Sequence, residues 1–325
     1  MSRLVPVLLA ALLVGALGAV PLRAAAPAAP NLAIVLNSGS ASISLVDMAT
    51  ETELKRIPVL REPHHVALSP DRRSLLVGDS GGNEMLFLDP QTGEIQRRIP
   101  LADPYQLGFS PDGRWLTVTG LARNQVDVYD AASMTLAHRF PARTMPSHLA
   151  YAPDSSVVYV TLQGSNQLAA FDLKAMAPLW VSAVGETPAG VIWLDGRLLV
   201  ADMGTDYIAV VDPVDGRVVR RVETGKGAHQ LFLSPDGRVL YVNNRVAGTT
   251  TALDPQTLAI QRTYKVPGGP DCIDFAPDGK LWITQRFIQK VAVLDPATGD
   301  IQSFPVGRSP HGIFLTTDLR DERRP

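Results

Sequence analysis

Apolar and polar residues alternate along most of this chain in short runs that are separated by turn residues. The runs are rich in Val, Ile, Leu and Tyr, as in "VVYVTL" and "VLYVNN". Such residues favour the pleated, half-buried surface of a β-sheet. Between the runs lie turns such as "SPDG" and "DPQTG", in which Pro presets one backbone torsion and Gly or Asp tolerates the next. The pattern predicts an all-β protein.

The runs recur with a regular period. An aspartate closes an apolar run at intervals of 40 to 42 residues, at Asp47, Asp89, Asp130, Asp172, Asp212, Asp254 and Asp295. Each period holds four runs, and the fourth mixes charged and apolar residues, as expected of a solvent-facing edge strand. We interpret the repeated aspartates as turn caps rather than chemical groups.

Four antiparallel strands in a period of this length are the mark of a β-propeller, and the number of periods gives the number of blades. The seven periods start at Pro63, Pro104, Pro146, Pro188, Ala228, Pro270 and Pro310. The last has room for only one strand, "HGIFLT", whereas residues 31–60 supply three strands without a first one. We therefore predict a seven-bladed propeller over residues 31–317, closed by one C-terminal strand that joins three N-terminal strands.

The two ends of the chain differ from the repeats. Residues 1–26 combine Arg3, an apolar run and an Ala-rich end, which predicts a secretory signal peptide. A membrane anchor is the alternative, since the run nears the length that spans a bilayer. Residues 27–30 are interpreted as a short linker and 318–325 as a polar tail. We expect a periplasmic or secreted protein with no membrane attachment after signal removal.

Composition and charge exclude several classes of function. The net charge of -2 among 325 residues shows no basic excess, so we predict no nucleic-acid partner. Cys272 is the only cysteine, so the fold has no intramolecular disulfide. The sequence contains no GxSxG, P-loop, HExxH or CxxCH motif, which excludes enzymes built on those motifs and covalent c-type haem. A closed ring has no need of a second copy to cover its edges, so we expect a monomer.

Propellers build sites by convergence, because each blade presents the same position to one central channel. The residues that follow the seven period starts are His64, Tyr105, Ser147, Ala189, His229, Asp271 and His311. One position further are His65, Gln106, His148, Gly190, Gln230, Cys272 and Gly312. Five of the six histidines fall in these two columns, and only His138 does not.

Ring closure makes four of these blades consecutive, so His229, Asp271, His311 and His64 are predicted to form one arc. Three imidazoles and a carboxylate suit zinc, copper or non-haem iron. A single axial imidazole would suit a noncovalent haem-like macrocycle instead.

Two arginines align with the same mouth of the channel. Arg245 and Arg286 follow the second strands of neighbouring periods, where they would pair with a carboxylate or phosphate of a bound cofactor or ligand. The alternative is that the polar residues only fill the hub and that Asp271 pairs with an arginine such as Arg286. His65 and His148 are expected to pack between blades, since adjacent strand positions point to opposite faces.

The repeat resembles a known family. The steps "YVTL", "YVNN" and "LVAD", with "SPDG" before them and "DPxTG" after, are similar to those of the exported YVTN-repeat, or YncE-like, propellers. The resemblance covers about residues 31–317 and implies the fold, whereas turn and packing motifs imply little about function. The family is similar in architecture to the haem d1 domain of nitrite reductase and to the nitrous oxide reductase propeller, and that similarity warrants no activity.

The leading functional hypothesis is an exported binding protein that presents its channel mouth to a small ligand, a metal or a protein partner. The second hypothesis is a periplasmic enzyme or a metal- or haem-handling protein that uses the His/Asp arc. The third is an interaction scaffold. The sequence indicates no particular substrate or reaction.

Overall fold

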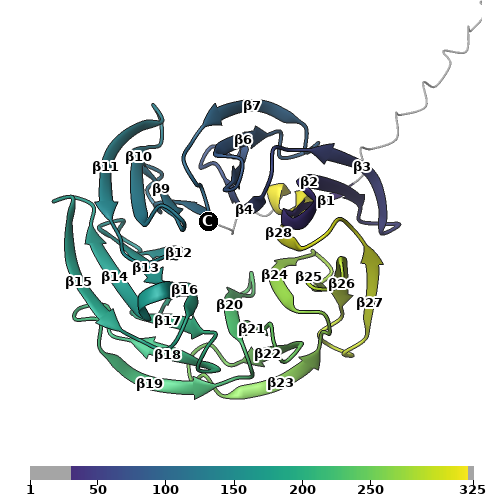
Figure 1. The fold of residues 1–325 in the computed structure, drawn as a ribbon. Coiled ribbons are helices and arrows are strands. Elements are labelled where there is room, and N and C mark those ends of the chain that lie inside the picture. Colours follow the sequence, from purple (N-terminus) through teal and green to yellow (C-terminus); the bar gives the residue numbers. More distant parts are fainter. Residues whose placement is uncertain (1–30, 321–325) are drawn as a thin grey trace, which may run out of the picture.

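The computed structural model describes residues 31–320 and shows seven four-stranded antiparallel sheets arranged as the blades of a ring (Figure 1). The predicted signal peptide and linker, residues 1–26 and 27–30, lie outside the described residues, as do residues 321–325. Within the described part, no helix has the length and apolar character needed to cross a bilayer.

Each blade runs from an innermost strand at the axis to an outermost strand at the rim. In that order, the closing blade holds β28 (Pro310–Leu315), β1 (Leu32–Asn37), β2 (Ser42–Asp47) and β3 (Thr52–Pro58). The second blade holds β4 (Pro63–Leu68), β5 (Leu75–Asp79), β6 (Glu84–Leu88) and β7 (Ile95–Pro100). The third holds β8 (Gln106–Phe109), β9 (Trp115–Gly120), β10 (Gln125–Asp130) and β11 (Thr135–Pro141).

The fourth blade holds β12 (Pro146–Tyr151), β13 (Val157–Leu162), β14 (Gln167–Asp172) and β15 (Ala177–Ala183). The fifth holds β16 (Pro188–Leu194), β17 (Arg197–Asp202), β18 (Tyr207–Val211) and β19 (Val218–Glu223). The last two are β20 (Ala228–Leu233), β21 (Leu240–Asn244), β22 (Thr249–Leu253), β23 (Ile260–Lys265), and β24 (Pro270–Phe275), β25 (Leu281–Gln285), β26 (Lys290–Leu294), β27 (Ile301–Pro305). Short 3-10 helices cover Ser38–Ser40 (η1), Gln163–Ser165 (η2) and Thr316–Arg320 (η3).

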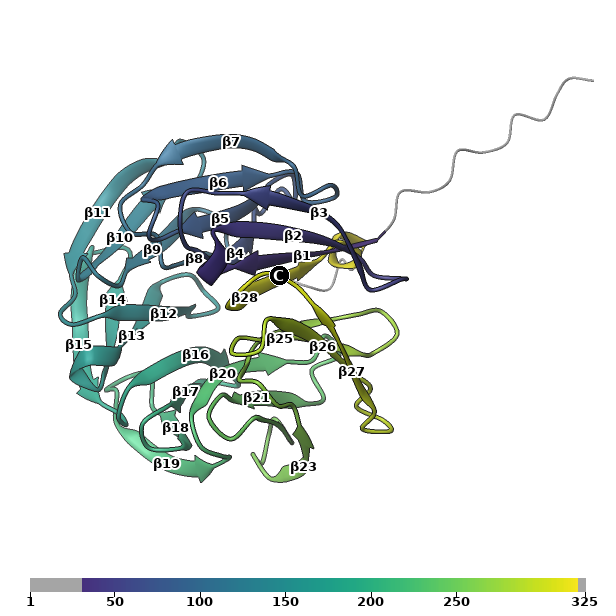
Figure 2. The same cartoon turned by 45° about the vertical axis from the view of Figure 1, so that its right-hand side comes forward.

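The predicted ring closure is confirmed. C-terminal β28 pairs antiparallel with N-terminal β1, so that the two ends of the described chain share one blade (Figure 2). The Leu32 amide also donates to Thr316 Oγ1 at 2.8 Å. Residues 318–320, which we assigned to the polar tail, belong to η3, and Asp318 is buried. Pairing the two ends removes the exposed edges that an open ring would have.

The cores lie between neighbouring blades. Ile34 and Leu36 of β1, for example, pack with Val77 of β5 and Leu86 of β6, and all four are fully buried. Each buried side chain of this size contributes about 1.5 to 3 kcal/mol. The outermost strands are mostly exposed, with a few half-buried or buried residues in each, as expected of solvent-facing edge strands. Blade-to-blade packing therefore holds the inner strands in fixed positions around the axis.

The innermost strands share an irregular start that determines what reaches the axis. In β4, Pro63 pairs with Asp79 and Val66 with Val77, so three steps along β4 match two along β5. The same shift occurs near the start of β12, β20 and β24, and in the pairing of β28 with β1. Such a β-bulge places an extra residue in one strand and turns its side chain.

The antiparallel order gives the ring two distinct faces. Every innermost strand begins at one face, which we call the mouth face. It is formed by the connections that follow the second and fourth strands of each blade. The connections that follow the first and third strands form the far face.

Candidate functional site

Five histidines from four blades meet at the axis beneath the mouth face. The ring of His64 lies 3.7 Å from that of His311 and 4.1 Å from that of Tyr105, measured between centroids. His65 lies 4.5 Å from His311 and 5.1 Å from His148. The five imidazoles, including His229, are only 0 to 4% exposed. The column of residues that the repeat predicts thus does converge in space.

His65 and His148 correct one expectation. We placed them between blades because adjacent strand positions normally point to opposite faces. The bulge at the start of β4 and β12 removes that alternation, and His64 and His65 both reach the axis, with ring centroids 4.9 Å apart. An irregular pairing of this kind leaves no mark in the apolar pattern, so the sequence did not reveal it.

Asp271 lies at the charged centre of the site. Arg245 Nη2 donates to Asp271 Oδ1 at 2.6 Å, and Arg286 Nη1 lies 3.3 Å from Asp271 Oδ2. Burial disfavours the carboxylate, but the guanidinium of Arg245 and the imidazoles of His311 and His229 together outweigh it and hold the pKa of Asp271 well below its usual range. The two arginines, 18% and 22% exposed, lie between Asp271 and solvent and form what we call the arginine lid. The sequence aligned both arginines with this mouth, and the structure pairs them with Asp271, as the hub-filling alternative expected of Arg286.

Hydrogen bonds fix which histidine nitrogens carry a proton. Arg245 donates to Nε2 of His229 at 2.6 Å, so the remaining proton of neutral His229 is on Nδ1. That Nδ1 lies 3.0 Å from Asp271 Oδ1. His311 Nδ1 donates to the carbonyl of His64 at 3.0 Å, which leaves the lone pair of Nε2 free. The acceptor nitrogen of His229 is therefore already used by Arg245, whereas Nε2 of His311 is available to bind a metal ion.

Several buried imidazole nitrogens have no hydrogen-bond partner among the described residues. They are Nδ1 of His64, Nε2 of His65, Nε2 of His148 and Nε2 of His311. An unsatisfied buried polar atom costs about 1 to 3 kcal/mol, so several together call for a ligand or bound water. Burial lowers the pKa of each of these histidines well below 6.5 and keeps the rings neutral, as metal binding requires.

Two overlapping sets of side chains can hold a metal ion. His64, His65 and His311 form one set, and His229, Asp271 and His311 form the other. In each set the ligand atoms lie within 4.8 Å of one another. The predicted arc of His64, His229, Asp271 and His311 is brought together in space but is divided between these sets.

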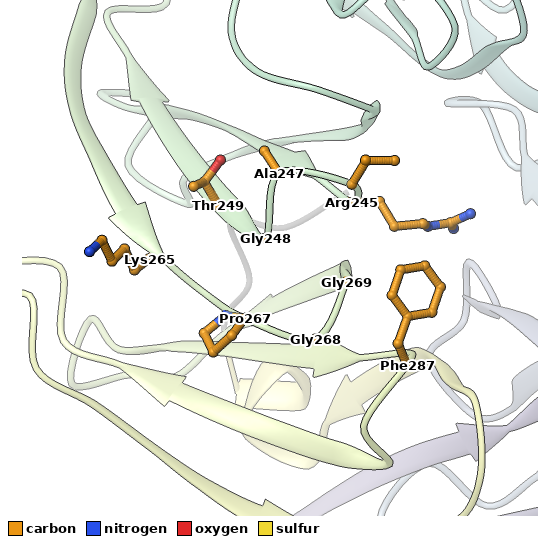
Figure 3. Close-up of a pocket in the computed structure, with 10 residues that line it drawn as sticks. Arg245, Ala247, Gly248, Thr249, Lys265, Pro267, Gly268, Gly269 and Phe287 are labelled. Carbon is orange, nitrogen blue, oxygen red and sulfur yellow. The ribbon is translucent and has the colours of Figure 1, made fainter.

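A groove of about 480 Å³ opens beside the arginine lid on the mouth face. Figure 3 shows Arg245 and Phe287 near one end of it and Lys265 at the other, with the Gly268–Gly269 loop between them. The loops of two neighbouring blades form its walls. Arg245, which touches Asp271, thus also lines a surface that solvent can reach.

The described fold and site define a seven-bladed β-propeller whose channel mouth is filled by histidines under an arginine lid. A family model described as YNCE-like beta-propeller matches residues 3–320. The chain therefore belongs to the YNCE-like β-propeller family, as its repeat predicts.

Other comparisons show similarity in part of the chain or in fold alone. An uncharacterized protein, YwcC, of Lactococcus lactis is 28% identical over 108 residues, which span 28% of this chain and only 32% of that relative. Dihydro-heme d1 dehydrogenase NirN, in complex with DHE, has a TM-score of 0.67 and 16% identity, over 90% of this chain and 78% of that one. The periplasmic gluconolactonase PpgL of Pseudomonas aeruginosa has a TM-score of 0.69 and 21% identity, over 88% of this chain and 98% of that one. At these identities the two solved structures share the fold, and function has to be argued from the site.

Proposed function

We propose that this protein is an exported binding propeller that takes up a zinc or copper ion at its histidine-filled channel mouth. The observation that carries the proposal is the set of three unpartnered, buried nitrogens on His64, His65 and His311. His64 and His65 lie on β4 and His311 lies on β28 of the neighbouring blade, and each side chain offers one ligand nitrogen within 4.8 Å of the others. One ion would satisfy all three nitrogens at once.

The donor set indicates the class of metal. Neutral imidazoles suit zinc and copper, whereas non-haem iron typically takes two histidines and a carboxylate. The set that contains Asp271 has this second composition, but Arg245 already occupies both Asp271 and His229. Zinc–nitrogen bonds of about 2.0 Å place tetrahedral ligands about 3.3 Å apart, so nitrogens that are farther apart within the 4.8 Å limit have to move inward on binding.

Other residues of the hub would support such a site. The hydrogen bond from His311 Nδ1 to the His64 carbonyl orients the His311 ring, which is the usual role of groups around a metal ligand. The arginine lid limits access of water and sets the charge above the histidines. Export to the periplasm or medium follows from the predicted signal peptide and is part of the proposal.

The second candidate is a cofactor-handling protein or enzyme that works at the same mouth. The observation in its favour is the arginine lid, because two partly exposed guanidinium groups beside buried imidazoles suit a macrocycle with carboxylate arms. The solved structure of dihydro-heme d1 dehydrogenase NirN, which has a similar fold, is a complex with DHE, and this supports testing haem as a ligand. Titration with haem, followed by absorbance, tests it: a spectral shift that Arg286→Gln weakens would favour this candidate over the metal-ion proposal.

Metal uptake is the first testable prediction. We expect the mature protein, purified without a histidine tag and equilibrated with Zn²⁺ or Cu²⁺, to retain about one ion per chain after gel filtration. His65→Ala removes a ligand and should reduce retention at least about tenfold, since lost ligands and their supports typically cost that much. Elemental analysis of the eluted protein gives the result.

His229→Gln is the matched control, because it alters the other histidine set and leaves His64, His65 and His311 in place. We expect it to keep the ion. Circular dichroism and thermal melting establish that both variants fold. Retention by His65→Ala together with loss in His229→Gln would assign the ion to the Asp271 set, and a metal-free wild type would overturn the proposal.

A further inference from the structure

Charge is divided unevenly between the two faces of the ring. The connections of the mouth face carry seven basic and four acidic residues, whereas acidic residues outnumber basic ones two to one in the connections of the far face. The whole chain has a net charge of only -2. The slight overall charge therefore conceals a positive face around the channel mouth, which would attract an anionic partner.

Five of the seven basic residues form no ion pair among the described residues. Arg61, Arg123, Arg143, Lys226 and Arg308 are exposed and form no ion pair within residues 31–320. Only the two arginines of the lid have a carboxylate partner. Unpaired cations gathered on one face gain nothing for the fold, and their positions fit an external anionic surface.

Two of these cations lie in the connections that lead into the strands of the proposed metal ligands. Arg61 lies in the connection that leads into His64, and Arg308 occupies the equivalent place before His311. Each is three residues from its histidine. A molecule that contacts these arginines would therefore be positioned over the site.

Exposed apolar side chains lie on the same face. Leu60, Met145, Val246, Phe287 and Ile288 are large, exposed and located in connections of the mouth face, whereas the connections of the far face expose Val214. Val246 and Phe287 line the groove beside Arg245. Apolar anchors within a charged rim are typical of protein–protein interfaces.

We propose that the mouth face is the docking surface for an acidic protein that exchanges a transition-metal ion with the histidine site. The inference rests on the proposed function. A protein fits better than a small anion, because the unpaired cations are spread over the connections of several blades and apolar anchors accompany them. The groove beside Arg245 would receive an apolar side chain of the partner. The ion keeps its charge during transfer and exchanges the carboxylates of the partner for imidazoles.

The test compares two donors of Cu²⁺. One is a synthetic peptide of glutamate and leucine loaded with Cu²⁺, which imitates an acidic protein, and the other is the neutral bis-glycinate complex. The variant is Arg61→Glu with Arg308→Glu, which reverses charge at the mouth without altering a ligand. We expect copper uptake from the peptide at low salt, followed by absorbance, to slow at least about tenfold in this variant, with no change for the neutral donor.

Arg238→Glu on the far face is the control and should leave both rates unchanged. Equal rates in the wild type and the mouth variant, or equal slowing with both donors, would overturn the docking proposal. Failure of both donors to load the wild type would instead refute the metal site itself. If single-stranded DNA, added as a competitor, blocked uptake more strongly than the peptide alone, the face would be a nucleic-acid surface and the proposal would be wrong.

Discussion

Replacing Asp271 with alanine is expected to lower the free energy of unfolding by about 3 to 5 kcal/mol. The substitution leaves the guanidinium groups of Arg245 and Arg286, which are largely buried, without their counter-charge. The Asp271 side chain is fully buried, so water does not readily take its place. Chemical denaturation of the metal-free protein measures the loss.

Two further variants distinguish the effect of the lost Asp271 charge from the effect of the cavity that alanine leaves. Arg245→Met combined with Asp271→Ala should recover much of the lost stability, because one uncompensated charge is removed together with its partner. Arg286→Gln alone should cost less than Asp271→Ala, since its contact is the longer one, at 3.3 Å, and its side chain is 22% exposed. A loss below about 1 kcal/mol for Asp271→Ala would show that the lid arginines do not depend on this carboxylate.

Asp202→Asn is expected to stabilise the protein at pH 8 by about 2 to 5 kcal/mol. Asp202 ends β17 and is fully buried, with Oδ1 accepting the Gly185 amide at 3.1 Å and Oδ2 unpartnered. Burial raises its pKa from 3.8 to about 8, although the Gly185 amide and the charge of Arg221 act in the opposite direction. The equivalent strand ends in β1 and β21 are the neutral amides Asn37 and Asn244, so a neutral side chain of this shape occurs at the same position of the repeat.

The sign of the pH dependence follows from the raised pKa. Between pH 3.8 and about 8 the folded protein holds a proton on Asp202 that the unfolded chain has lost. The contribution of this group to the free energy of unfolding is therefore complete at low pH, falls as pH rises through this range and levels off above about 8. Asp202→Asn should remove this fall, so wild type and variant should differ little near pH 4 and most at pH 8. If wild type and Asp202→Asn were equally stable at pH 4 and also at pH 8, the raised pKa of Asp202 would be contradicted.

Asp79→Asn is the matched control, with the opposite expected sign. Asp79 ends β5 at the position equivalent to Asp202, but both of its oxygens accept backbone amides. These are Arg61 at 2.9 Å, Glu62 at 2.6 Å and Gly82 at 2.7 Å. An amide group would place its NH₂ against at least one of these donors, so we expect a loss of about 1 to 3 kcal/mol at any pH near neutrality.

The repeat was sufficient to predict the ring, because each period contains its own turns and apolar strands. Blade number, the closure of β28 on β1 and the convergence of His64, His229, Asp271 and His311 all follow from counting equivalent positions. These are properties of the order of residues along the chain. They depend little on local departures from ideal pairing.

Other features of the site depend on such departures. The bulge that turns His65 to the axis is a pairing shift between β4 and β5, and nothing in "EPHHVAL" distinguishes it from a regular strand. The pairing of Arg245 with both Asp271 and His229 depends on side-chain conformations. The positive mouth face became visible only once each connection was assigned to a face. Net charge alone, which we used to exclude nucleic acid, averages over both faces.

The arginine lid affects both the stability of the fold and the access of a metal ion to the histidines. Its contacts with Asp271 hold two cations over the histidines, and the same cations lie at the solvent boundary of the site. The lid contacts Asp271 and His229, which share His311 with the proposed metal site. Variants of the lid should therefore change the rate of metal uptake more than the final occupancy.

The central claim is that a transition-metal ion binds between His64, His65 and His311. Crystals soaked in Zn²⁺ and measured on both sides of the zinc absorption edge test it most directly. We predict one strong anomalous peak about 2.0 to 2.1 Å from Nδ1 of His64, Nε2 of His65 and Nε2 of His311. A peak confined to His229 and Asp271, or no peak within the hub of a fully soaked crystal, would contradict the account.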